Sequence, residues 1–183
     1  MTDTLDLVAQ FSTKLASAGG MTHRVTTSAE AAGLITTLAE GADPVWAAPA
    51  LPATAPALVE ALNASGLSLR FDGDPTTVRD QPLGITIARN AIAETGSTLL
   101  VEPSLGERSV SLMTQTLIVV CPTSSILLGL DEVAPVLRDI SLFEASYATL
   151  VTGPSRTADI ERQLTVGVQG PAVFHVIFVD ELD

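Results

Sequence analysis

Short, almost uninterrupted apolar runs, separated by segments with helical spacing, constrain the fold of this chain more than any other feature. Leu117–Cys121 reads Leu-Ile-Val-Val-Cys, and the run at Val173–Val179 is interrupted by a single histidine. A strand that is apolar on both faces is typical of a parallel sheet covered by helices. The alternation therefore predicts an α/β domain with a mainly parallel sheet flanked by helices.

Periodicity and turn residues place the individual elements. Strands are expected at 44–48, 67–71, 84–88, 97–101, 117–121, 148–152 and 173–179. Helices are expected at about 5–15, 28–40, 57–65, 131–146 and 156–164. Because the strands between residues 84 and 120 have little helix between them, part of the sheet should be antiparallel. We expect a single domain over residues 1–183, with residues 1–20 forming an N-terminal helix that packs on the body or projects from it.

Composition narrows the classes of function. Of the 183 residues, 46% are hydrophobic and 16% are charged, which excludes an intrinsically disordered chain. Nine basic and twenty-one acidic residues give a net charge of −12, so the surface repels phosphate backbones and anionic lipids. We expect no nucleic-acid partner. No apolar run approaches the roughly 20 residues of a spanning helix, and the first residues do not resemble a signal peptide. These features predict a cytoplasmic protein without a membrane span.

The reactive side chains exclude several mechanisms. Lys14, the only lysine, lies in the first expected helix, so no P-loop exists and a Schiff-base lysine is not expected. Cys121 is the only cysteine, so this chain alone cannot supply the several thiolates that ligate an iron–sulfur cluster. We expect Cys121 to be buried and structural. His23 lies in an expected polar connection, and His175 is interpreted as a buried histidine with one satisfied nitrogen. We expect no metal and no cofactor in this chain.

Glu94 stands alone among small and apolar residues in Ala91–Ser97, between two expected strands. Burial would raise its pKa and suit the carboxyl to work as a general base or nucleophile. The alternative is a turn carboxylate that accepts backbone N–H bonds. We take Glu94 as the candidate catalytic residue, and Thr95, Gly96 and Ser97 as candidate ligand-binding residues.

The segment Thr152–Glu161 follows an expected strand and opens an expected helix. Unpaired N–H groups and the helix dipole favour an anion at such a helix start. The alternative is an ordinary strand–turn–helix capped by Ser155 or Thr157. The turn Gly167–Pro171 is a weaker element, whose glycines permit close backbone approach. The candidate ligand-binding residues in these two segments are Gly153, Pro154, Ser155, Arg156, Thr157, Asp159, Gly167, Gln169 and Gly170.

Together these segments resemble the lactate-utilisation (LUD) domain family, in particular its lactate utilisation protein C type. The resemblance covers residues 84–179, and its motifs are Gly84–Ala88, Ala91–Gly96, Thr152–Glu161 and Gly167–Pro171. It implies a NagB/RpiA/CoA-transferase-like fold and a role in a system that oxidises L-lactate to pyruvate. It also implies an iron–sulfur subunit and a cysteine-rich subunit as partners, with the clusters held only by a partner.

The resemblance also bears on single residues. Some CoA transferases of the implied fold use a glutamate nucleophile, and analogy between fold relatives puts that role on Glu94. The chain departs from the family pattern at two positions. Gln169 stands where many relatives have the histidine of Gly-Val-His-Gly-Pro, and Leu117 stands where they have a histidine before the central strand, with Thr114 at the preceding Leu-Pro.

Three functions stay open at this point. The first is an accessory subunit of a lactate-oxidising iron–sulfur complex. The second is an independent enzyme or binding protein, with a carboxylate, phosphate or CoA-like ligand between the Glu94 turn and Gly153–Asp159. The third is an interaction protein that docks through the apolar face of its first helix, which carries Leu5, Val8, Phe11 and Leu15.

Overall fold

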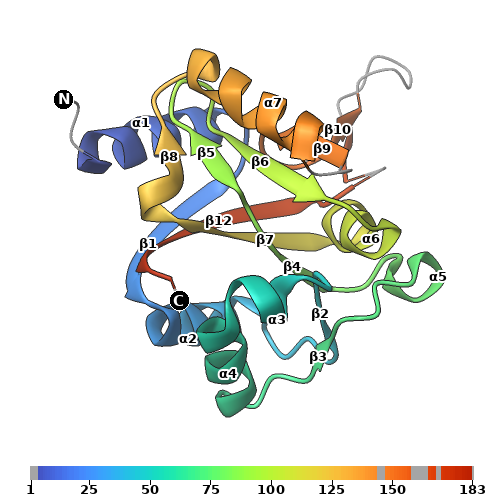
Figure 1. Cartoon of the computed structure of the whole chain (residues 1–183). Helices are drawn as coiled ribbons and strands as arrows, with labels where there is room; N and C mark the ends of the chain where they lie inside the picture. The colour runs from blue at the N-terminus through green and yellow to red at the C-terminus, as the bar shows by residue number, and fades with distance from the viewer. Residues whose placement is uncertain (1–3, 144–146, 158–164, 168–169, 183) are drawn as a thin grey trace.

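The computed structural model describes residues 4–143, 147–157, 165–167 and 170–182. Its larger sheet has six strands, all parallel, in the order β1-β12-β7-β4-β2-β3 (Figure 1). These strands are β1 Met21–Thr27, β12 Val173–Glu181, β7 Thr116–Pro122, β4 Leu83–Ile87, β2 Val45–Ala47 and β3 Leu69–Arg70. The expected α/β fold with a mainly parallel sheet is confirmed.

A smaller sheet lies over the larger one and has the order β8-β5-β6-β9 (Figure 1). Its strands are β8 Ile126–Leu127, β5 Asn90–Ile92, β6 Ser97–Glu102 and β9 Tyr147–Val151. β6 pairs antiparallel with β5 and with β9, whereas β5 pairs parallel with β8. The antiparallel pairing expected after residue 84 is therefore present, but it belongs to this second sheet.

Three helices cover the lower face of the larger sheet in Figure 1. They are α2 Ser28–Leu38, α3 Leu51–Thr54 and α4 Pro56–Ala64. Alternate strand residues point to this face because successive side chains in a strand alternate sides. Aliphatic side chains from the strands and the helices form one buried cluster here, which includes Ile85, Ile118, Val120, Ile177, Ile35, Leu51, Leu58 and Leu62.

The opposite face of the larger sheet is covered by α1 Thr4–Ser17 and by the smaller sheet (Figure 1). The Phe11 ring meets the Phe178 ring edge to face, with centroids 5.0 Å apart. Val8, Phe11 and Leu15 are all buried against this domain. The N-terminal helix therefore packs on the body, and the prediction that these three residues form a docking face is wrong. Of the four residues proposed for that face, Leu5 is exposed.

Helix α7, Val133–Phe143, covers the outer face of the smaller sheet through Val133 and Ile140. Pro135 lies in its first turn, as expected, because that turn needs no backbone N–H from it. A one-turn 3₁₀ helix, Leu130–Glu132, precedes α7. Within the described residues, no helix combines the length and the apolar content that crossing a bilayer requires.

Three elements differ from the sequence prediction. The connection that carries His23 is strand β1, an edge strand whose polar residues alternate between exposed and half-buried. Helix α6, Leu105–Met113, was not expected, although Ser104 and Glu107 form a capping box at its start. The helix expected from residue 156 is wrong at its start, because Arg156–Thr157 form β10 and pair antiparallel with β11, Thr165–Val166.

The reason for the third difference is a local pair of backbone bonds. Ser155 N–H donates to Pro171 O at 2.8 Å, and Gly167 N–H donates to Ser155 O at 2.9 Å. These bonds hold Ser155 against the returning segment and keep the chain extended beyond it. The spacing of glycine and proline alone does not distinguish a short antiparallel strand pair, such as β10 and β11, from the start of a helix. The remaining short elements are α5 Pro75–Val78 and a 3₁₀ turn at Thr123–Ser125.

Candidate functional site

Glu94 lies in the turn between β5 and β6, and its side chain is exposed rather than buried. Its Oε2 accepts the Leu130 N–H at 3.0 Å, while its own backbone N–H donates to Leu128 O at 3.0 Å. The carboxylate thus holds the loop that follows β8. This is the geometry of the turn carboxylate that the sequence left open as the alternative.

The Glu94 carboxylate also lines a cavity of about 480 Å³, which we call the Glu94 cavity. Its lining residues are Gln10, Glu94, Leu128, Gly129, Asp131 and Glu132. Gln10 comes from α1, so the N-terminal helix forms one wall. Glu132 Oε2 accepts the Leu128 N–H at 2.7 Å, which fixes a second carboxylate beside the first. Carboxylates accept hydrogen bonds and protons, so this cavity suits a ligand that presents a hydroxyl or an amine.

The residues after Glu94 close against the last turns of α1. Gly96 has φ 68°, and a Cβ added there would lie 2.5 Å from Leu15 N. Only glycine allows this approach, because any side chain would meet the helix backbone. Ser97 Oγ lies 2.6 Å from Thr152 Oγ1, so this segment is bonded to the second motif. The Thr95 hydroxyl is buried and makes no hydrogen bond in the structure.

The second motif closes against the same end of α1. Gly153 has φ 72°, and a Cβ added there would lie 2.8 Å from Ala18 O. The Arg156 guanidinium donates a hydrogen bond to Ala18 O. A cation at the carboxyl end of a helix is favourable because the helix dipole is negative there. We call these contacts of Gly96, Gly153 and Arg156 with residues 15–18 the α1 clamp.

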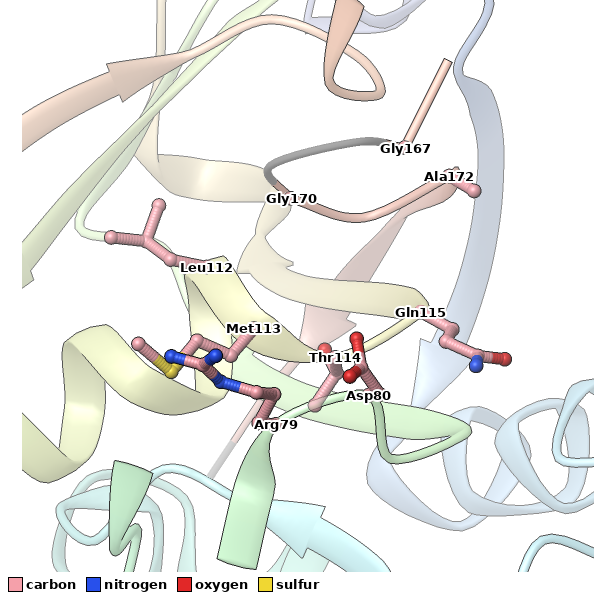
Figure 2. A pocket seen from close by; sticks show the side chains of 9 residues that line it. All are labelled: Arg79, Asp80, Leu112, Met113, Thr114, Gln115, Gly167, Gly170 and Ala172. Atoms are coloured by element: carbon pink, nitrogen blue, oxygen red, sulfur yellow. The ribbon is translucent and has the colours of Figure 1, made fainter. Parts of the chain in front are cut away.

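A second cavity, of about 660 Å³, lies where the chain enters β4, β7 and β12 (Figure 2). Its lining residues are Arg79, Asp80, Leu112, Met113, Thr114, Gln115, Gly167, Gly170 and Ala172. Figure 2 shows the side chains of Arg79, Asp80 and Met113 around this cavity, and the Asp80 N–H donates to Met113 O at 2.9 Å. Thr114 Oγ1 donates to Val110 O at 3.0 Å. A Cβ added to Gly170 would lie 3.0 Å from Ser155 Cβ. The segment that begins at Gly167 therefore packs against the segment that begins at Thr152 at these two residues.

Comparison with known proteins decides the family. The model of the LUD domain family matches residues 77–179. This range contains the Glu94 turn, the segments that begin at Thr152 and Gly167, and most lining residues of both cavities. This chain belongs to the LUD domain family. The resemblance found in the sequence is thereby confirmed.

Relatives of this LUD domain include proteins named lactate utilization protein C. That of Macrococcus caseolyticus is 36% identical over 102 residues, which cover 54% of this chain and 44% of the relative. That of Bacillus subtilis is 35% identical over 102 residues, covering 54% and 42%. The chain therefore spans less than half the length of these relatives. A DUF162 family protein from Deinococcus radiodurans has the same fold, with a TM-score of 0.73 at 20% identity over 98% of this chain and 99% of that protein.

The LUD domain structure separates the candidate residues into groups. Glu94 lines one cavity, and Gly167 and Gly170 line the other. The Glu94 turn and Gly153 do not open a shared cavity in the described part of the chain, because each closes against α1. Pro154 is half-buried beside this contact. Asp159 and Gln169 lie outside the described residues, and for Thr157 the structure describes only the backbone.

Two further residues bear on the departures from the family pattern. Leu117, at the place of a histidine in many relatives, is fully buried in the LUD domain core, in the same apolar cluster as Phe174 and Val119. Cys121 is also fully buried, and burial raises the pKa of its thiol to about 12. Its Sγ lies 3.3 Å from Ser125 Oγ. The prediction of a buried, structural cysteine is confirmed.

One pair of side chains in this LUD domain was not predicted from the sequence. His23 Nε2 lies 3.0 Å from His175 Nδ1 across the parallel pair β1 and β12. Burial lowers the pKa of both imidazoles, and the His23 charge further lowers the pKa of His175. The two residues are 152 positions apart, so no spacing could reveal them. Only a prediction that residues 21–27 form a strand beside the last strand would have brought the two histidines together.

Proposed function

We propose that this LUD domain acts in the oxidation of L-lactate to pyruvate, as the component without iron–sulfur clusters. The observation that carries the proposal is its 36% identity to a lactate utilization protein C over 102 residues. The family match over residues 77–179 holds Glu94 and the two glycine motifs. The accessory role is part of this proposal, and the cysteine content of the chain supports it. The reaction removes two electrons and two protons from lactate, and this chain has one cysteine, which is buried.

The electrons therefore go to a partner in this proposal. The partners are an iron–sulfur subunit, whose clusters accept the electrons, and a cysteine-rich subunit. Thiolates are the usual ligands of such clusters, and a single cysteine with a pKa of about 12 is not one that forms a thiolate readily.

Within this proposal, Glu94 is the residue that meets the substrate. Its carboxylate lines a cavity of about 480 Å³ and can accept a hydrogen bond or a proton from the hydroxyl of a 2-hydroxy acid. Thr95 adds a buried hydroxyl that has no partner in the structure. Gly96, Ser97, Gly153 and Arg156 act as positioning residues, because the α1 clamp sets where Glu94 lies relative to Gln10.

Growth on L-lactate tests the proposal. Deleting the gene should abolish growth on L-lactate and leave growth on glucose unchanged, and the intact gene should restore growth. Glu94→Gln removes the charge and keeps the side-chain size, so it should fail to restore growth. Glu60→Gln, at an exposed position on α4, is the matched control and should restore it. Normal growth of the deletion strain on L-lactate would reject the proposal.

Affinity purification of the tagged protein from lactate-grown cells tests the partners. Recovery of an iron–sulfur protein and a cysteine-rich protein supports the accessory role. Recovery of this chain alone, from cells whose growth on lactate needs it, would reject that role. It would support instead an independent protein that binds a small carboxylate, phosphate or CoA-like ligand. The same preparation with Glu94→Gln should keep the partners, because Glu94 is proposed to meet substrate.

A further inference from the structure

The pair formed by His23 and His175 is explained by neither the family motifs nor the proposed function. His23 is half-buried on edge strand β1, and His175 is 6% exposed on the neighbouring strand β12. The rings are tilted by 32°, with centroids 5.3 Å apart, so they meet through their nitrogens rather than by stacking. Such a pair needs a proton or a metal ion between the facing nitrogens, because two lone pairs repel each other.

We propose that His23 and His175 form a binding site for a first-row transition metal ion, with copper as the preferred ion. The distance between the facing nitrogens supports this. Metal–imidazole bonds of about 2.0–2.1 Å place two nitrogens of one ion about 2.9 Å apart at a right angle and about 3.4 Å apart at the tetrahedral angle. The observed separation of 3.0 Å lies within that interval.

The hydrogen bond between the two rings also suits a metal, because a metal ion binds the neutral imidazole through a nitrogen that carries no proton. The neutral pair shares one N–H between the facing nitrogens. When a metal ion enters, that proton moves to the other nitrogen of its own ring, and both facing nitrogens become ligands. The exchange releases no proton and changes no side-chain charge.

Met21 indicates which ion the site prefers. It is the register partner of His175, and it lies on the same face of β1 as His23, two residues away. Its side chain is 43% exposed, and its place on the shared face makes its thioether the third ligand of this proposal. Imidazole and thioether together favour copper over magnesium, calcium or manganese, which prefer oxygen ligands. Among divalent first-row ions, Cu²⁺ binds a given nitrogen site most tightly.

Copper binding to the full chain, with any polyhistidine tag removed, tests the proposal. The chain has two histidines, so any imidazole bound to copper must come from this pair. Calorimetry with CuCl₂ should show one ion bound per chain. Pulsed EPR should detect the remote nitrogens of two imidazoles, and a signal without imidazole nitrogens would overturn the proposal.

Single variants sharpen the result. Even the loss of a residue that only supports a ligand costs about 10–100-fold in metal affinity, so His23→Gln should weaken copper binding by at least about tenfold. Arg70→Gln, at an exposed position on β3 at the other edge of the larger sheet, is the control and should leave binding unchanged. Met21→Leu should weaken the binding of Cu⁺, prepared with ascorbate, more than that of Zn²⁺. Equal copper affinity of His23→Gln and the wild type would overturn the site, whatever the growth experiments on lactate show.

Discussion

The two faces of the larger sheet are built in different ways. The face under α2, α3 and α4 is closed mainly by a buried cluster of aliphatic side chains, from residues that mostly precede the family match. The face under α1 is also apolar at its centre, but at its rim it depends on Gly96, Gly153 and Arg156, which contact the helix backbone directly. The Glu94 turn, Gly153 and the Glu94 cavity lie on the second side.

This difference bears on whether the family motifs indicate a ligand site or tight packing. A glycine whose added Cβ would lie within 3 Å of a backbone atom of another segment has a structural reason to be there, so its presence does not by itself indicate a ligand. Glu94 differs, because its exposed carboxylate lies in a cavity. The α1 clamp therefore explains a large part of the motifs through packing and leaves Glu94 as the residue best placed for chemistry.

The largest expected effect on stability tests whether α1 is part of the hydrophobic core. Phe11 is fully buried and its ring meets Phe178, so Phe11→Ala should lower the free energy of unfolding by about 3–5 kcal/mol. Leu58→Ala, on the other face, is the reference and should cost about 2–5 kcal/mol. Urea unfolding measures both. A loss below about 1 kcal/mol for Phe11→Ala would show that α1 is a peripheral attachment.

The next effect tests the clamp itself. Gly96→Ala introduces a Cβ 2.5 Å from Leu15 N at a backbone with φ 68°, so it should lower the free energy of unfolding by about 3 kcal/mol. Gly33→Ala is the matched control, since nothing lies within 4 Å of its added Cβ. In the middle of α2 it should raise stability by about 0.5–1 kcal/mol. Equal effects of the two substitutions would contradict the close approach of Gly96 to α1.

A smaller effect concerns the cation of the clamp. Arg156→Ala removes the guanidinium that donates to Ala18 O and should lower the free energy of unfolding by about 1 kcal/mol. Hydrogen exchange should show the change in the last turn of α1 before it appears elsewhere. Arg70→Ala removes a charge from an exposed position on β3 and serves as the control. If both variants lose the same stability, the effect of Arg156 is one of net charge and not of the contact.

Much of the fold was predictable, and the parts that were not share a cause. Leu117–Cys121 and Val173–Val179 carry their own signal, because strands buried on both faces must be apolar. β1 carries none, since an edge strand with polar residues looks like a connection. The second sheet and the α1 clamp depend on which segments meet in space. Residue spacing predicted Glu94 and the glycines as special, but it could not show that Gly96 and Gly153 both close against the end of α1.

The smallest expected effect concerns the histidine pair on the edge of the larger sheet. Because burial lowers the folded-state pKa of His23 and His175 below the usual 6.5, the unfolded chain binds protons first as the pH falls. The pair's contribution is therefore complete above about pH 7.5 and declines as the pH falls through 6.5 towards the lowered values. Protonation of both rings also removes the bond at 3.0 Å, since neither nitrogen can then accept it.

Other groups titrate nearby and must be separated from the pair. Hydrogen bonds from Thr76 and Arg24 lower the pKa of Asp74 and Asp180, so their contributions are lost only in more acidic solution, below about pH 5. Burial raises the pKa of Glu102, which acts in the opposite direction, since its contribution is lost as the pH rises. Urea unfolding from pH 8 to pH 5 in EDTA, with the double variant His23→Gln/His175→Gln as reference, isolates the pair. The wild type should lose more stability than the double variant over that range, and parallel curves would show that neither imidazole changes its pKa on folding.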